Sequence, residues 1–287
     1  MPDKNNFGDL PKENSNKENS KIVIIPVPYD ETSTWIKGAD KGPEAIIEAS
    51  GNMELYDIET NSQVYLRGIY TSPPIIENSS PEKMVTAVQK TITTLIKENK
   101  FIVVLGGEHS VTIGAVKAHA EHYKNLSVLQ LDAHSDLRDE YDDSKYNHAC
   151  VMARAKELCP IVQVGIRSMD VCEKENMDTS RVFFAKDIYK NTNWIEQVNK
   201  KLTENVYITI DLDVFDPSIM PSTGTPEPGG MLWYNVLELL KTISKEKNIV
   251  GVDVVELCPN EQNKAPDFMA AKLIYKLLSY KFEDEAK

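Results

Sequence analysis

The amino-acid sequence predicts a three-layer α/β/α fold whose central sheet is mostly parallel and doubly wound. Short β-branched runs alternate along the chain with longer segments that carry apolar residues at helical spacing. Such alternation is typical of a parallel sheet with helices on both faces. The predicted strands are nearly continuous apolar runs, which indicates that both faces of the sheet are covered.

The expected elements follow one another in regular order. Buried strands are predicted at IVIIPVP (22–28), FIVVLG (101–106), SVLQLDAH (127–134), IVQVGI (161–166), VYITIDLD (206–213) and IVGVDVVEL (249–257). Helices are predicted at 80–98, 111–123, 149–158, 194–202, 232–245 and 266–280, and several of them begin at Ser, Asp or Asn. The segment 55–70 is predicted to be an edge hairpin, and no fixed-period repeat is present.

The length and composition indicate a short N-terminal leader followed by one domain large enough to be an enzyme. A chain of 287 residues with 41% hydrophobic content can bury roughly three quarters of its unfolded surface. Residues 1–20 are polar and charged, so we expect a flexible leader at 1–20 and a single domain at 21–287. The sequence has no signal-peptide h-region and no apolar stretch approaching the ~20 residues that cross a bilayer.

The net charge limits the classes of partner that the protein can bind, and the cysteines indicate its cellular compartment. Lys and Arg number 32 against 44 Asp and Glu, which gives a net charge of −12. Such a field repels phosphate backbones and anionic membranes but attracts a small cation, so we expect neither nucleic acid nor membrane as a partner. The four cysteines form no C-x-x-C pair, which favours a reducing compartment and predicts a cytoplasmic protein.

Acidic residues and histidines follow four of the predicted strands. They occur in Gly106-Gly107-Glu108-His109-Ser110, in Asp132-Ala133-His134-Ser135-Asp136, in Asp211-Leu212-Asp213 and at Glu256. Ligands of open α/β sheets bind at the carboxyl ends of the strands. These residues are therefore expected to share one binding edge.

Each of these residues alone has an ordinary structural explanation. Asp132 or Asp211 could cap a helix, His109 could cap or pack, and His134 could be a hydrogen-bonded core residue. Together, however, they crowd like charges at the strand ends, which is strongly unfavourable without a counter-ion. The pattern as a whole favours a metal site.

The same residues are sufficient for two divalent ions. Alternation along an extended strand would bring Asp132, His134 and Asp136 to one side, and likewise Asp211 and Asp213. With His109 they provide four carboxylates and two imidazoles. This set suits manganese better than zinc, which prefers Cys and His. Two such ions could activate water as a nucleophile at neutral pH.

The ordered motifs resemble the ureohydrolase family, which includes arginases and agmatinases. The similarity lies in GGEHS (106–110), DAHSD (132–136), YNHACVMARA (146–155), DLDVFDP (211–217), STGTPEPGG (222–230) and VELCP (255–259). It extends from PVPYDETSTWIKGADKGPEAI (26–46) to AAKLI (270–274), nearly the whole chain after the leader. The resemblance implies an arginase-like fold and a homotrimer or homohexamer.

The resemblance also implies roles for individual residues. One Mn²⁺ would be held by His109, Asp132, Asp136 and Asp211, and the second by Asp132, His134, Asp211 and Asp213. Asp136 would relay a proton to the leaving amine, His148 would shuttle protons at the mouth, and Glu256 would accept the substrate guanidinium. Without the resemblance, His148 would be an ordinary capping or surface residue. Glu256 could be a buried ion-pair partner, but its place at a strand end beside the acids favours a functional role.

The implied reaction is the hydrolysis of a guanidino compound to urea and a primary amine. Arginases carry an Asn shortly after DAHxD and a Ser after the shuttle histidine, whereas this chain has Arg138 and ACVMARA. The TGTPEPGG and DLRDEY stretches look more like those of agmatinases, so we expect agmatine as substrate, putrescine as product and a role in polyamine biosynthesis. Glu227 is a candidate neighbour of the substrate amine.

Arg138 sets the main alternative for the substrate. Its charge would oppose the ammonium of agmatine unless Asp139, Glu140 or Asp142 neutralises it, and it would favour a carboxylate-tailed substrate such as guanidinobutyrate. Arginase activity and a non-catalytic, metal-binding paralogue with a regulatory role are the further alternatives. A dinucleotide-binding oxidoreductase is excluded, because no G-x-G-x-x-G follows the first strand and no P-loop occurs.

Overall fold

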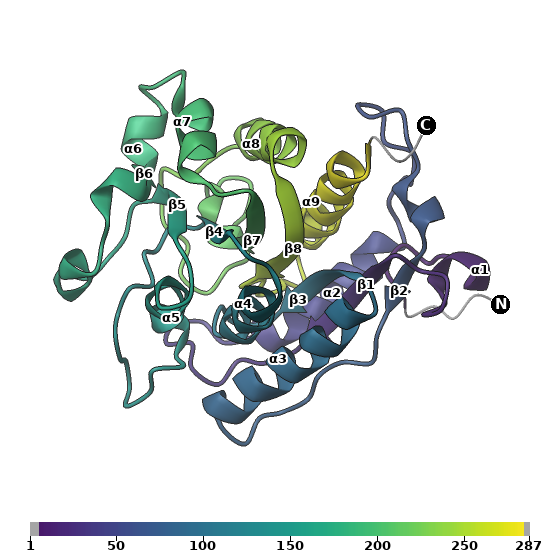
Figure 1. The fold of residues 1–287 in the computed structure, drawn as a ribbon, viewed down its shortest axis with the longest axis horizontal. Coiled ribbons are helices and arrows are strands. Elements are labelled where there is room, and N and C mark those ends of the chain that lie inside the picture. The colour runs from purple at the N-terminus through teal and green to yellow at the C-terminus, as the bar shows by residue number, and fades with distance from the viewer. Residues whose placement is uncertain (1–5, 284–287) are drawn as a thin grey trace.

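The computed structural model describes residues 6–283 and contains one eight-stranded sheet (Figure 1). Its strands are β1 (Ile22–Val27), β2 (Ile69–Thr71), β3 (Phe101–Gly106), β4 (Leu126–Leu131), β5 (Ile161–Ile166), β6 (Val182–Phe184), β7 (Asn205–Asp211) and β8 (Asn248–Val255). Their order is β2-β1-β3-β8-β7-β4-β5-β6, and every pairing is parallel. The predicted α/β/α fold is confirmed.

Helices cover both faces of this sheet. They are α1 (Lys12–Ser15), α2 (Gly42–Ser50), α3 (Pro81–Lys97), α4 (Val111–His122), α5 (Val151–Lys156), α6 (Ala185–Ile188), α7 (Trp194–Lys201), α8 (Trp233–Glu246) and α9 (Ala265–Lys281). Helices α2, α7, α8 and α9 contribute to one apolar cluster, and α3, α4 and α5 contribute to the other. The two clusters lie on opposite faces of the sheet.

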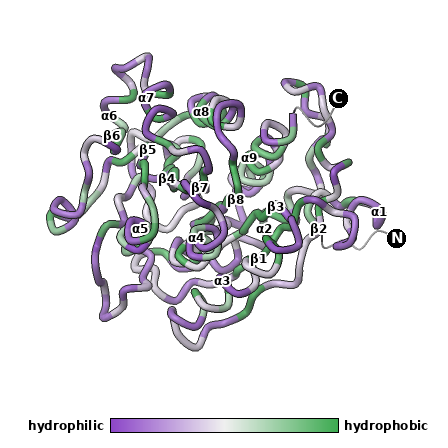
Figure 2. The backbone as a smooth tube through the Cα atoms, viewed as in Figure 1, coloured by the Kyte–Doolittle hydropathy of each residue, from purple (hydrophilic) through white to green (hydrophobic). Residues whose placement is uncertain are grey.

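The alternation of side chains along each strand explains why the core has two halves. In β1, Ile22 and Ile24 belong to the α2–α9 cluster, whereas Val23 and Ile25 belong to the α3–α4 cluster. Successive side chains of a strand point to opposite faces, so a strand covered on both faces must be apolar throughout. Figure 2 shows hydrophobic residues along strands such as β3 and β5 and hydrophilic residues along the outer loops.

The structure corrects the prediction for the segment 55–70. It forms no hairpin: an isolated antiparallel bridge joins Asp57 to Ser62, a 3₁₀ helix covers Val64–Arg67, and β2 then pairs with β1 in parallel. Helix α2 and the short edge strands β2 and β6 were not predicted. A strand of three residues is too short to show a recognisable hydrophobic period.

Part of the leader predicted at 1–20, residues 6–20, packs against the domain. Phe7 and Leu10 are buried in the α2–α9 cluster. The backbone N–H of Phe7 donates to Thr71 Oγ1 (2.9 Å), and that of Gly8 donates to Ser50 Oγ (2.8 Å). Two apolar side chains and these hydrogen bonds are enough to fix an otherwise polar segment to the sheet.

The topology brings the four motif-bearing strands together. Strands β3, β8, β7 and β4 are consecutive in the sheet, although β3 and β8 lie far apart in the sequence. Because the strands are parallel, their carboxyl ends lie at one edge. Among residues 6–283, no helix is both long and apolar enough to span a bilayer.

Candidate functional site

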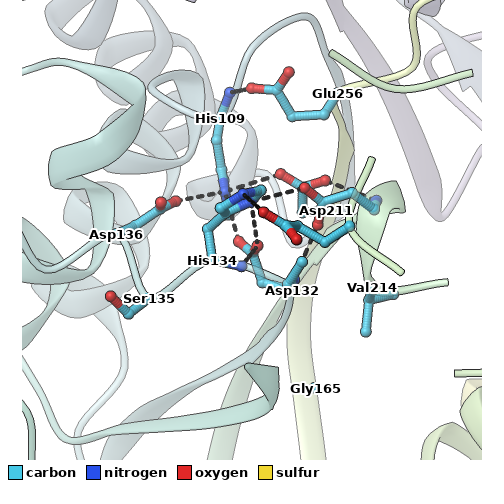
Figure 3. Close-up of polar contacts among 12 residues, drawn as sticks. His109, Asp132, His134, Ser135, Asp136, Gly165, Asp211, Val214 and Glu256 are labelled. Carbon is cyan, nitrogen blue, oxygen red and sulfur yellow. Dashed lines mark hydrogen bonds and ion pairs between the residues drawn. The ribbon is translucent and has the colours of Figure 1, made fainter. Parts of the chain in front are cut away.

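The first group of potential metal ligands consists of His109, Asp132 and Asp211, whose ligand atoms all lie within 4.8 Å of one another. His109 Nδ1 lies 3.1 Å from Asp132 Oδ2 and 3.5 Å from Asp211 Oδ2. Asp136 Oδ2 lies 3.0 Å from the same nitrogen, as Figure 3 shows. Oxygen and nitrogen ligands about 2.1 Å from an octahedral ion are about 3 Å apart, so these separations suit a shared cation.

The second group consists of Asp132, His134 and Asp213. His134 Nδ1 lies 2.8 Å from Asp213 Oδ2 and 3.7 Å from Asp132 Oδ1. Asp132 belongs to both groups, and its two carboxylate oxygens face different histidines. The structure therefore brings all six predicted ligands together, with Asp132 between the two histidines.

The backbone that produces this convergence differs from the predicted strand alternation. Strand β4 ends at Leu131, before the first ligand, and Asp136 has a left-handed backbone with φ +52°. Asp211 is the last residue of β7, and Asp213 lies in the 3₁₀ helix Leu212–Val214. Tight turns, rather than an extended strand, thus direct the carboxylates inward.

The hydrogen bonds of His109 provide a test of whether a cation fits. Thr209 Oγ1 donates to Asp253 (2.5 Å), so the 2.8 Å contact between His109 Nε2 and this hydroxyl requires a proton on Nε2. A neutral His109 then carries its lone pair on Nδ1, which is buried, makes no hydrogen bond and faces three carboxylates. That arrangement is repulsive unless Nδ1 binds a proton or a cation lies among these atoms; the neighbouring carboxylates indeed raise the pKa of His109 well above its usual range, and a metal ion fits the same place.

The pKa values of Asp136 and Asp211 reflect the crowding of carboxylates around His109. Burial, with the neighbouring Asp132 charge, raises the pKa of Asp136 to about 7. Burial and the adjacent Asp213 raise the pKa of Asp211 well above its usual range. A divalent cation would reverse both shifts, because it stabilises the ionised carboxylates.

A cavity of about 320 Å³ opens above these groups. Glu256 lines it and has a left-handed backbone, with φ +66°. Its Oε1 accepts a hydrogen bond from the backbone N–H of His109 (2.7 Å). Burial and the nearby Glu108 charge raise the pKa of Glu256 well above its usual range. A cationic ligand in the cavity would restore the charge of this carboxylate.

His148 lines the same cavity from the loop before α5. It begins a 3₁₀ helix, His148–Cys150, that Asn147 caps by accepting a hydrogen bond from Ala149 N (3.0 Å). Burial lowers the pKa of His148 to about 4, so the imidazole is neutral at pH 7. The three predicted catalytic residues Asp136, His148 and Glu256 therefore border one cavity.

Arg138 also lines the cavity, but it is already paired. Its Nη2 lies 3.3 Å from Asp170 Oδ2, and its guanidinium lies 4.6 Å from the centre of the Tyr141 ring. The expected partner Asp139 instead contacts Arg154 (3.5 Å). The charge of Arg138 is thus neutralised by a residue that follows β5, more than thirty positions away in the sequence.

Comparison with known proteins places this site in a family. The Arginase family model matches residues 20–279. The chain belongs to the arginase family. An N(1)-aminopropylagmatine ureohydrolase of Synechocystis sp. is 40% identical, over 93% of this chain and 90% of the relative. A Thermus thermophilus protein of the same name is 37% identical, over 92% of this chain and 91% of the relative.

Solved structures of the arginase family share the fold. The agmatine ureohydrolase of Thermoplasma volcanium superposes with a TM-score of 0.87 at 33% identity, covering 96% of this chain and 94% of that chain. The similarity thus extends over almost the whole chain.

Three residues that border this arginase-family site were not assigned from the sequence. Thr32 contacts both Glu108 and His148, and Glu173 accepts hydrogen bonds from residues on both sides of Asp136. The adjacency of Glu108 to His109 and the Thr-rich PYDETSTW stretch were the available signals. Glu227, the guessed neighbour of the amine, has its Oε1 3.9 Å from His134 Nε2.

Proposed function

We propose that this protein is a ureohydrolase that splits the guanidinium group of an agmatine-type amine into urea and a primary amine. The observation that carries the proposal is the pair of His/Asp groups that share Asp132 beneath a cavity bordered by Glu256. Membership of the arginase family supports hydrolysis of an amidino C–N bond. The relatives named N(1)-aminopropylagmatine ureohydrolase and agmatine ureohydrolase agree with it.

Two Mn²⁺ ions are the proposed cofactors. His109, Asp132, Asp136 and Asp211 would hold one, and Asp132, His134, Asp211 and Asp213 the other. When bound, the ions would activate water and stabilise negative charge that develops on the reacting carbon's substituents. Carboxylates with one histidine per ion favour manganese over zinc.

The protein's own groups would bind the substrate and move its protons. The Glu256 carboxylate would orient the planar guanidinium by charge-assisted hydrogen bonds. Asp136, which borders the cavity, would give a proton to the leaving amine. His148, neutral and at the cavity wall, would exchange protons with solvent.

The Arg138–Asp170 pair bears on the choice of substrate. Because Asp170 already neutralises Arg138, a carboxylate-tailed substrate such as guanidinobutyrate would find no free cation there. A cationic amine would instead meet an acid-rich cavity. Agmatine fits this environment, as the sequence analysis expected.

N(1)-aminopropylagmatine is the second candidate, favoured by the relatives at 37–40% identity that carry its name. It has the same guanidinium and one more amine, so the same chemistry applies and only the length of the cationic tail differs. We further propose that the enzyme acts in the cytoplasm, in polyamine biosynthesis, as a homotrimer or homohexamer.

The deciding experiment is to strip the protein with chelator, reload it with Mn²⁺ and measure urea from each substrate in parallel. The substrates are agmatine, N(1)-aminopropylagmatine, arginine and guanidinobutyrate. Urea release from one of the two amines, lost in Asp211→Ala and retained in the distant, exposed Asp178→Ala, supports the proposal. Two bound metals with no urea from any substrate would favour the non-catalytic alternative.

A further inference from the structure

We propose that Thr32 and Glu108 are positioning residues that hold His148 in a single orientation and in one tautomer, with the proton on Nδ1. This inference rests on the proposed role of His148 as a proton carrier. It is carried by a chain of contacts from a buried carboxylate through one hydroxyl to the imidazole ring.

The Thr32 hydroxyl has a complete set of partners. Thr32 Oγ1 donates to Glu108 Oε1 (2.6 Å). The same oxygen accepts a hydrogen bond from the backbone N–H of His148 (3.0 Å) and lies 3.2 Å from His148 Nδ1. A hydroxyl has one proton and two lone pairs. With its proton given to Glu108, Thr32 can only accept from Nδ1.

The direction of that hydroxyl depends on Glu108 being an acceptor. Glu108 is fully buried and receives four hydrogen bonds. Oε1 accepts from Thr32 Oγ1 and Ser110 Oγ, and Oε2 accepts from the backbone N–H groups of Thr32 and Ser33. All four partners are donors, which a carboxylate acceptor satisfies. Neither oxygen of Glu108 faces an acceptor. A proton on this carboxyl would therefore have no partner and would disrupt the four hydrogen bonds.

The loop that carries Thr32 is itself fixed. Asp30 accepts hydrogen bonds from the backbone N–H groups of Gly38 (2.7 Å) and Ala39 (3.1 Å) and from the hydroxyl of Ser33. The loop also crosses Gly107, where a Cβ would lie 2.0 Å from Tyr29 O. Only glycine permits this approach, which places Glu108 directly beneath Thr32 and Ser33.

These contacts leave His148 Nε2 as the basic nitrogen of the ring. A neutral imidazole that donates from Nδ1 has its lone pair on Nε2. In a neutral histidine, the hydrogen bond made by one ring nitrogen determines whether the other nitrogen carries the proton. Glu108 and Thr32 do not line the cavity of about 320 Å³, so they act on proton transfer through His148.

The test combines tautomer measurement with kinetics. Nitrogen-15 NMR of histidine-labelled protein reports which ring nitrogen carries the proton, and a His148→Gln variant assigns the signal. We expect the Nδ1–H tautomer in the wild type and in Thr32→Ser, which retains the hydroxyl. Thr32→Val, nearly isosteric but without the hydroxyl, should lose this preference. Thr86→Val, which removes an exposed hydroxyl on α3, is the matched control.

Kinetics with Mn²⁺-loaded protein provide the second readout. In Thr32→Val, kcat should fall by about tenfold or more with little change in KM, because proton transfer and not substrate binding is impaired. Thr32→Ser should recover kcat to within about twofold. If Thr32→Val does not fold, Thr32→Ala gives the same comparison.

The outcomes separate this inference from the proposed function. An Nε2–H tautomer of His148 in the wild-type protein overturns the inference without any variant. A Thr32→Val protein that retains both the Nδ1–H tautomer and wild-type kcat overturns it as well. Absence of urea from all four guanidino substrates contradicts the proposed function, while the NMR measurement still decides the role of Thr32.

Discussion

Glu256 Oε1 accepts a 2.7 Å hydrogen bond from the backbone N–H of His109. This bond joins the end of β8 to the turn between β3 and α4, so the proposed guanidinium acceptor and a proposed metal ligand are held in one unit. Glu256 thereby has two separable properties: an acceptor oxygen that fixes the turn and a charge available to a cation.

Glu256→Gln separates these properties, because glutamine can still accept from His109 N–H but carries no charge. We expect kcat/KM for the preferred amine to fall by about 100-fold, equivalent to ~2.7 kcal/mol of transition-state stabilisation. Steady-state urea assays measure this change, with bound manganese determined in the same samples. Unchanged kcat/KM at unchanged metal content would rule out the role of Glu256 in guanidinium binding.

Asp132 belongs to both ligand groups, whereas Asp213 belongs to one. Asp132→Asn should therefore weaken both Mn²⁺ sites, and Asp213→Asn chiefly the one that includes His134. Calorimetric titration of chelator-stripped protein measures both stoichiometries. In the wild type, Mn²⁺ at 100 times the Kd of one site should stabilise the fold by about 2.7 kcal/mol through that site. Equal losses in the two variants would contradict the shared position of Asp132.

Glu173 holds the turn at Asp136 from a different loop. It is buried and accepts hydrogen bonds from Ser135 Oγ (2.8 Å), Leu137 N (2.8 Å) and Asp170 N (2.6 Å). Glu173→Ala should reduce stability by about 1–3 kcal/mol, because it leaves buried donors without an acceptor. It should also weaken Mn²⁺ binding, since Asp136 loses its left-handed turn.

Asp178→Ala is the matched control for Glu173→Ala. Asp178 caps the next 3₁₀ helix, Thr179–Arg181, at an exposed position away from the ligand groups. It should leave Mn²⁺ affinity unchanged. Calorimetry and urea unfolding of the two variants provide the comparison, and equal Mn²⁺ affinities would show that Glu173 does not position Asp136.

His119 should make stability depend on pH below neutrality. Burial lowers the pKa of His119 to about 4 in the folded protein, whereas the unfolded chain titrates near 6.5. As pH falls below 6.5, the unfolded state binds a proton that the folded state does not, so stability is lost by about 2 kcal/mol between pH 7 and pH 5.

The contribution of His119 to the pH dependence of the free energy of unfolding is obtained by comparing the wild type with a His119 variant. Urea unfolding of wild type and His119→Gln at pH 7 and pH 5 isolates it from other titrating groups. The wild type should lose more stability than the variant over this interval. Equal losses of stability in the wild type and the variant would mean that His119 has the same pKa in the folded and unfolded states.

Lys276 and Asp57 form a buried ion pair, with Nζ 2.9 Å from Asp57 Oδ2. Lys276→Met should cost about 3–5 kcal/mol, because it leaves a buried carboxylate without its counter-ion. Lys200→Met, which breaks the exposed Lys200–Glu196 pair, is the control and should change stability little. Urea unfolding of both variants is the measurement, and similar small losses would show that the buried pair is unimportant.

The sequence itself was sufficient for the fold class and for the expectation that these acids and histidines gather at one edge of the sheet. The apolar runs at β1, β3, β4, β5, β7 and β8 are recognisable because buried parallel strands are hydrophobic on both faces. His109, Asp132 and Asp211 follow such runs directly, so their shared edge could be predicted from the parallel order of the strands.

The tertiary structure alone decided which residues support this set. Thr32 reaches Glu108 across 76 positions and His148 across 116, and Arg138 finds Asp170 rather than Asp139. At Asp136 the chain forms a left-handed turn, whereas the sequence had predicted an extended strand with alternating side chains. Local periodicity encodes which residues end a strand, whereas side-chain partners from distant loops depend on how the packed helices and strands bring those loops together.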